Sequence, residues 1–177
     1  MDRSSTRNGP RPDRDKLFLL FRIGEERYAL EANEIVEILP RLKLKAIAQA
    51  PLWVAGIFAH RGKVVPVIDV SALNCGEPAR ARTSTRLVLV HYRHDREHPA
   101  QMLGLILEQA TETLRCPASD FKAYGLDNRL APYLGPVRED PRGLLQWINV
   151  QELLSEPVRE LLYPVTPPDL ELLEDAR

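Results

Sequence analysis

The stretch that decides the fold is GIFAHRGKVVPVIDV, residues 56–70. Its second half, from Val64 to Val70, is rich in β-branched residues and predicts a strand. Pro66 has no backbone N–H to donate, so we expect it at a strand edge or a bulge. Asp69 is well placed to cap a single helical turn over residues 70–73. The apolar half of the stretch is therefore a structural strand with its cap.

The composition favours a protein-binding module. The chain has 177 residues, is 44% hydrophobic and carries a formal net charge of -1, which suits one domain or two small ones. The balanced charge, without aromatic residues interleaved on a basic strand, argues against a nucleic-acid partner. The two cysteines, Cys75 and Cys116, form no CxxC pair, which favours a reducing cytoplasm. The apolar runs are too short to span a bilayer, so no direct membrane insertion is expected.

On both sides of this stretch, the sequence predicts short strands separated by turns. Residues 31–39 fit either a strand or a helix that ends at Pro40. Asn149 is expected to cap a C-terminal helix, with Glu152 completing a capping box. The other expected elements are strands at 16–23, 27–30 and 86–92, a turn at 24–26, a charged hairpin loop at 93–101, renewed apolar structure at 102–116, loops at 117–142, and a strand followed by a helix at 143–162.

The second half of the chain repeats the pattern of the first. The matches keep one order at an offset of about 70 to 80 residues, and one of them places Glu37 opposite Glu112. This predicts two small barrels of similar topology that share a core, because one barrel alone would be marginally stable. A groove between two such barrels would suit a docking partner. The matched segments are 17–20 with 87–90, 29–39 with 104–114, 53–56 with 132–135, and 64–73 with 144–153.

Motifs for catalysis are scarce. The sequence has no GxSxG and no glycine-rich phosphate loop, so neither nucleophilic catalysis nor a phosphate cradle is indicated. His91, His94 and His98 lie close together and raise the alternative of a metal-dependent enzyme. Their spacing matches no standard zinc pattern, and the interleaved charges fit a solvated hairpin loop. A binding module and a metal-dependent enzyme remain the two competing hypotheses, and no cofactor is expected.

Three segments, residues 18–39, 53–73 and 103–114, resemble the CheW-like domain of bacterial chemosensory coupling proteins. The most specific part is the Gly-Ile-x-x-x-Arg-Gly-x-Val-Val-Pro-Val-Ile-Asp run. The resemblance implies a mainly β fold, in which two SH3-like five-stranded β-barrels form one CheW-like domain with a few short helices. The domain would span residues 16–162, between a disordered N-terminal tail at 1–15 and a proline-rich, acidic C-terminal tail at 163–177.

The same resemblance implies a function without catalysis. Proteins of this family tie the cytoplasmic hairpin of a chemoreceptor of the methyl-accepting type to the regulatory domain of a chemotaxis-type histidine kinase. The expected location is cytoplasmic, at membrane-bound receptor arrays and held there through protein contacts. In the family the kinase contacts an apolar barrel end, whose residues we do not assign in this sequence.

The receptor-binding residues carried over from the family lie in two segments. An arginine beside an apolar strip suits an acidic and apolar helical hairpin. The competing interpretations are a solvated turn for Arg61, a positive φ for Gly62, and a place in the core for at least one of Ile35 and Ile38. The predicted receptor-binding set is Ile35, Val36, Glu37, His60, Arg61, Gly62 and Lys63.

The sequence departs from the family beside the signature arginine. The family usually has Asn-Leu before Arg-Gly, and this chain has Ala59-His60. Because the change lies in the expected receptor-facing loop, we hypothesise a divergent coupling protein that serves a pathway other than flagellar swimming.

Overall fold

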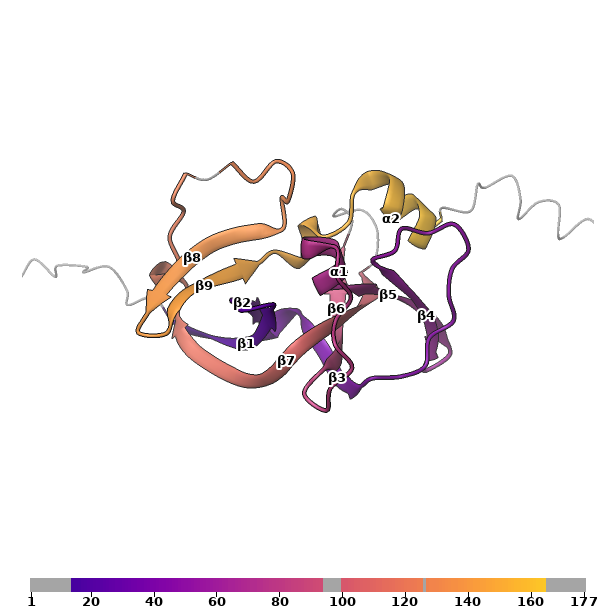
Figure 1. Cartoon of the computed structure of the whole chain (residues 1–177), viewed down its shortest axis with the longest axis horizontal. Helices are drawn as coiled ribbons and strands as arrows, with labels where there is room; N and C mark the ends of the chain where they lie inside the picture. The colour runs from indigo at the N-terminus through magenta and orange to yellow at the C-terminus, as the bar shows by residue number, and fades with distance from the viewer. Residues whose placement is uncertain (1–13, 94–99, 126, 165–177) are drawn as a thin grey trace, which may run out of the picture.

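The computed structural model describes residues 14–93, 100–125 and 127–164. In this part of the chain, nine strands alternate with two short helices and three 3-10 turns (Figure 1). In chain order they are β1 (Asp15–Ile23), β2 (Glu26–Glu31), η1 (Ala32–Glu34), β3 (Ile35–Pro40), β4 (Val54–His60), β5 (Lys63–Asp69), α1 (Val70–Cys75), β6 (Arg86–Tyr92), β7 (Gln101–Pro117), η2 (Ala118–Asp120), β8 (Leu134–Asp140), β9 (Gly143–Ile148), η3 (Val150–Glu152) and α2 (Glu156–Leu162).

The strands form two five-stranded barrels that share β7. Barrel A consists of β1, β2, β9, β8 and the second half of β7, and barrel B consists of β3, β6, β5, β4 and the first half of β7. In Figure 1, β8 and β9 lie at one end of the molecule, β4 and β5 lie at the other, and β7 runs between them. The predicted mainly β fold of two SH3-like barrels is confirmed.

Each barrel combines strands from both halves of the chain: barrel A takes β1 and β2 from the first half, and barrel B takes β6 and the first half of β7 from the second. β3 follows the β1–β2 hairpin in sequence but pairs with β6 in barrel B. The second half of β7 follows the β6–β7 hairpin but pairs with β1 in barrel A. Barrel A is therefore built from two separate pieces of chain, β1–β2 and the stretch from the second half of β7 to β9, whereas barrel B is one continuous piece from β3 to the first half of β7.

Three apolar clusters hold the two barrels together. The interior of barrel A holds Phe18, whose ring lies 5.0 Å from that of Phe121 and 4.9 Å from that of Trp147. The interior of barrel B is built around Val67 and Leu87. A third and larger cluster takes side chains from both barrels. The predicted shared core is therefore present, and it removes from water the apolar surface that one small barrel would leave exposed.

Strand register supports the internal repeat and corrects one part of it. Glu37 lies opposite Leu89 on β6, and Glu112 lies opposite Leu20 on β1, so the two glutamates are equivalent. Leu20 in turn pairs with Ala29, and Leu89 pairs with Gly104. Leu20 therefore corresponds to Leu89, and the match of residues 17–20 with 87–90 was shifted by one position.

The predicted caps are confirmed only in part. The Asp69 carboxylate accepts a hydrogen bond from the backbone N–H of Ala72 at 3.1 Å, and the helix it caps, α1, runs two residues beyond the expected turn. Asn149 caps only the short η3. The capping box with Glu152 was wrong, because the backbone N–H of Asn149 donates to the Tyr133 carbonyl instead. The C-terminal helix begins after Ser155.

Two further expectations differ in detail. The stretch 117–142, expected as loops, contains strand β8. Pro66 lies inside β5, which pairs with β7 only from Val67 onward. Pro66 therefore occupies a part of the strand that has a neighbour on one side alone, where its missing N–H costs no ladder bond.

Parts of the earlier predictions fall outside the described residues. These are nearly all of the two predicted tails, and His94 and His98 of the proposed metal loop. None of the helices in the described ranges is long and apolar enough to cross a membrane.

Candidate functional site

The two predicted receptor-binding segments meet at the open side of barrel B. β3 and β4 are the end strands of this barrel and share no ladder. Glu37 of β3 bridges the gap: its Oε2 atom lies 3.2 Å from Nε2 of His60 and 3.5 Å from an Nη of Arg61. The structure thus brings together Glu37, His60 and Arg61, which the sequence placed in separate segments.

The loop between β4 and β5 is a two-residue hairpin turn. His60 pairs with Lys63, and the two residues between them, Arg61 and Gly62, have φ values of 50° and 78°. Positive φ at both central residues is typical of the type I′ turn, whose twist matches that of the flanking strands. Gly62 meets the conformational demand expected of it. Arg61 adopts a conformation uncommon for a residue with a Cβ, and its side chain is 78% exposed.

The apolar residues of β3 divide between core and surface. Ile35 is partly buried and packs against the shared core, so it contributes to stability. Val36 and Ile38 are exposed. The ordinary alternation of a strand explains the pattern, and a β-bulge in addition leaves Val36 without a partner on β6.

A further exposed apolar side chain completes the surface. Val64 is 67% exposed, one residue after the turn. The sequence analysis assigned Val64 to a structural strand and did not include it among the receptor-binding residues, because a β-branched run predicts a strand without showing which of its side chains are exposed. Lys63, next to it, is also exposed and forms no ion pair with any residue of the described ranges. We call Val36, Glu37, Ile38, His60, Arg61, Lys63 and Val64 the β3–turn surface.

Barrel A carries a counterpart of the Glu37–Arg61 pair. Oε2 of Glu112 lies 3.2 Å from Nη1 of Arg142, at the tip of the β8–β9 hairpin. Glu112 is the register equivalent of Glu37, and the hairpin arginine is displaced by one position, since Arg142 falls on Gly62. A carboxylate joined to a hairpin tip is therefore a recurring feature of this fold, and by itself it does not identify a binding site.

The residue before the turn distinguishes the two barrels. The equivalent of His60 is Asp140, which accepts two hydrogen bonds from Arg27, at 2.8 and 3.0 Å. These bonds, with smaller help from Arg142 and Arg138, lower the pKa of Asp140. Barrel A thus fills this position with an ion pair to Arg27, and barrel B fills it with an imidazole that contacts Glu37.

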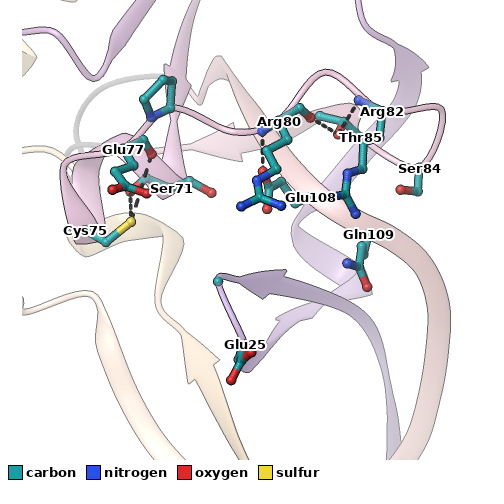
Figure 2. A pocket seen from close by; sticks show the side chains of 12 residues that line it. Glu25, Ser71, Cys75, Glu77, Arg80, Arg82, Ser84, Thr85, Glu108 and Gln109 are labelled. Atoms are coloured by element: carbon teal, nitrogen blue, oxygen red, sulfur yellow. Dashed lines mark hydrogen bonds between the residues drawn. The ribbon is translucent and has the colours of Figure 1, made fainter.

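A pocket of about 220 Å³ lies under the link that joins α1 to β6. Figure 2 shows Arg80 and Arg82 reaching from this link toward Glu108 and Gln109 of β7. The Glu108 carboxylate accepts a hydrogen bond from the backbone N–H of Arg80, which ties the link to the barrel. Because Glu25, Glu77 and Glu108 offset the charge of the two arginines, the pocket does not favour an anion.

The metal hypothesis finds no support among the described residues. No group of three or more His, Cys, Asp or Glu side chains in them is arranged to hold a metal ion. His91 is exposed on β6, and the other two histidines of the proposed loop lie outside the described ranges. Cys116 is buried inside barrel A, and burial raises the pKa of its thiol, so this cysteine is a core residue.

Comparison with known proteins places this geometry in a family. The model of the CheW-like domain matches residues 17–158. The chemotaxis protein CheW of Helicobacter pylori is 28% identical over 142 residues, covering 78% of this chain and 81% of its own length. The CheW of Klebsiella aerogenes is 23% identical over 78% of this chain and 81% of its own. Protein FrzA of Myxococcus xanthus is 31% identical over 44% of this chain and 47% of its own.

The solved structures show the same fold. The crystal structure of the scaffolding protein TtCheW from Thermoanaerobacter tengcongensis superposes with a TM-score of 0.69, at 19% identity. The superposition covers 86% of this chain and 94% of that protein.

Proposed function

This chain belongs to the CheW-like domain family, and we propose that it is a non-catalytic adaptor that couples a chemoreceptor to a chemotaxis-type histidine kinase. Its relatives include chemotaxis proteins and a scaffolding protein, which supports a role in chemosensory signal transduction. The adaptor works in the cytoplasm and reaches membrane-bound receptor arrays through protein contacts alone. One domain, residues 16–162, carries this function between its two tails.

The receptor binds the β3–turn surface. The observation that carries this proposal is the convergence of His60 and Arg61 on the single carboxylate of Glu37, beside the exposed side chains of Val36 and Val64. The arginine is largely exposed, so it can reach a receptor carboxylate or the carbonyls at a helix C-terminus without leaving its turn. The exposed valines supply the apolar contact that a helical hairpin requires.

The weak contact between Arg61 and Glu37 allows Arg61 to exchange Glu37 for a receptor carboxylate. At 3.5 Å the pair is an exposed contact of small net stability, whereas an arginine held in a desolvated interface gains more. Receptor carboxylates therefore compete well for Arg61, while His60 remains to hold Glu37. Gly62 and Ile35 act indirectly, Gly62 by permitting the turn and Ile35 by anchoring β3 to the core.

Titration calorimetry of the purified chain tests the proposal. The two titrants are the cytoplasmic hairpin of a chemoreceptor and the regulatory domain of a histidine kinase, both from the same genome. We expect saturable binding to each, without any turnover. Absence of binding to both would overturn the adaptor function, and metal-dependent activity of the purified chain would favour the enzyme hypothesis instead.

The divergent Ala59-His60 pair suggests a specialised partner. A leucine at position 60, usual in the family, could not form the contact that Nε2 of His60 makes with Glu37. We therefore propose that this adaptor serves a receptor other than those of flagellar swimming, because the shape and polarity of its receptor-facing loop differ.

A further inference from the structure

Barrel B carries a groove of about 390 Å³ between the β3–β4 connection and the link after α1, on a different part of the barrel from the β3–turn surface. Its floor is formed by Leu87 and Ile106, two buried side chains of the core of barrel B. Its wall is the connection between β3 and β4, with Leu42 exposed and Leu52 99% exposed. The two exposed leucines at the edge of this groove form a surface suited to apolar side chains of a ligand.

The rim of the groove is cationic. Arg41 and Lys43 flank Leu42, and neither forms an ion pair with a residue in the described parts of the chain. The acidic group in the lining is Asp69, whose carboxylate already accepts hydrogen bonds from the backbone N–H groups of Ala72 at 3.1 Å and Ala79 at 2.8 Å. The groove therefore selects a ligand with leucine-type side chains and negative charge.

The chain itself contains such a ligand. Its last thirteen residues, VTPPDLELLEDAR (165–177), lie outside the described ranges. They place three leucines among four acidic side chains, with one arginine. The apolar and acidic character of this segment complements both the leucine wall and the cationic rim.

The segment is long enough to reach the groove. The chain before it is fixed at Tyr163, which stacks on Tyr92 and donates a hydrogen bond to the Met102 carbonyl at 2.8 Å. Ile106 in the groove floor lies four residues further along β7, about 13 Å away along the strand. Thirteen residues span up to about 43 Å when extended, so the leucines reach the groove with slack to spare.

We propose that the acidic C-terminal segment, residues 165–177, docks in the groove of barrel B. Tethering gives the segment an effective concentration near the millimolar range, so modest contacts suffice to fill the groove. The docked segment covers the exposed leucines in the free protein, and any partner that binds in the groove must displace it. The proposal stands independently of the receptor site.

Disulfide trapping in the full chain tests the docking. In a Cys75→Ser background, which removes the exposed thiol, the pair Leu52→Cys with Leu172→Cys is compared with Leu130→Cys with Leu172→Cys. Leu130 is the matched control because it is also fully exposed, on the loop before β8. We expect an intramolecular disulfide at position 52 to form roughly tenfold faster than at position 130.

Charge reversal separates docking from simple proximity. Arg41→Glu with Lys43→Glu should abolish the excess rate at position 52, and so should about 1 M salt, where screening acts within a few ångströms. Arg115→Glu with Lys122→Glu on barrel A changes the net charge equally and should leave the rate unchanged. Equal rates at positions 52 and 130, persistence of the excess after reversal at 41 and 43, or disulfides only between two copies would overturn the proposal.

Discussion

The carboxylate of Glu37 lies 3.5 Å from the guanidinium of Arg61, and this contact joins two strands of barrel B that share no backbone hydrogen bonds. The equivalent contact in barrel A, between Glu112 and Arg142, is 3.2 Å long. The same ion-pair position thus occurs twice in one molecule. Only the copy in barrel B has a histidine beside it and two positive φ values in its turn. The Glu112–Arg142 pair of barrel A can therefore serve as a control when the Glu37–Arg61 pair of barrel B is mutated.

Replacing Arg61 should weaken receptor binding. Arg61→Asn removes the charge and suits the left-handed conformation of the turn, so the hairpin should keep its shape. We expect the dissociation constant for the receptor hairpin to rise about 5- to 150-fold, the equivalent of about 1–3 kcal/mol. Calorimetry measures the change. Arg142→Asn is the control and should bind like the wild type, whereas equal weakening by both variants would deny Arg61 a specific role.

Replacing His60 with the family residue should change partner choice. His60→Leu removes the contact with Glu37 while keeping an apolar side chain beside Phe58. We expect the affinity for a receptor from a swimming pathway to rise about fivefold or more relative to that for the native receptor. Parallel titrations with both receptor hairpins give the ratio of the two affinities. If this ratio is the same in the variant and the wild type, His60 does not determine receptor specificity. The pathway hypothesis itself would fail if the wild-type protein restored arrays in a strain that lacks its standard coupling protein.

A tyrosine–asparagine contact couples the two barrels. The hydroxyl of Tyr133 donates to Oδ1 of Asn74 at 2.8 Å. Tyr133→Phe should lower the free energy of unfolding by about 0.5–1.5 kcal/mol, because one buried hydrogen bond is lost. Urea unfolding measures the difference. Tyr124→Phe, at an exposed position, should have no effect, and equal stability of both variants would deny the bond a structural role.

The Arg27–Asp140 pair should make stability depend on pH. The hydrogen bonds from Arg27 lower the pKa of Asp140 in the folded state. The pair therefore stabilises the fold above about pH 3.9, the unfolded value, and its contribution is lost as the pH falls through the folded pKa.

Asp140→Asn provides the measurement for this pair. At pH 7 the variant should be about 1.5–3 kcal/mol less stable to urea than the wild type, since a charged hydrogen bond in a largely buried site is weakened. The difference should shrink below about pH 4. A difference that stays constant down to pH 2 would show that Asp140 contributes through packing rather than through its charge.

The sequence was sufficient to predict the two barrels, because the repeat and the β-rich strand from Val64 to Val70 are local patterns. It could not predict the exchange of β3 and the second half of β7 between barrels, since pairing between distant strands leaves no local signal. Alternation along β3 places Ile35 and Ile38 on opposite faces, as expected, but the sequence could not tell which of the two packs against the core.

The sequence also predicted which segments contain the candidate site, but not how their side chains meet. The family signature located the turn, but the meeting of Glu37 with His60 and Arg61 results from the closure of the barrel. The second ion pair escaped notice because Arg142 occupies the position of Gly62 rather than that of Arg61. A side chain as long as arginine reaches the same carboxylate from either position, so matching residue by residue misses the equivalence.

Bridging of receptor and kinase tests the central claim most directly. Receptor hairpins assembled on vesicles are mixed with the kinase regulatory domain and sedimented with and without this protein. If the protein is an adaptor, the kinase domain should sediment with the vesicles only when the protein is present, and Arg61→Asn should reduce that fraction while Arg142→Asn should not. Sedimentation of the kinase domain that does not depend on the protein, or none in its presence, would contradict the account.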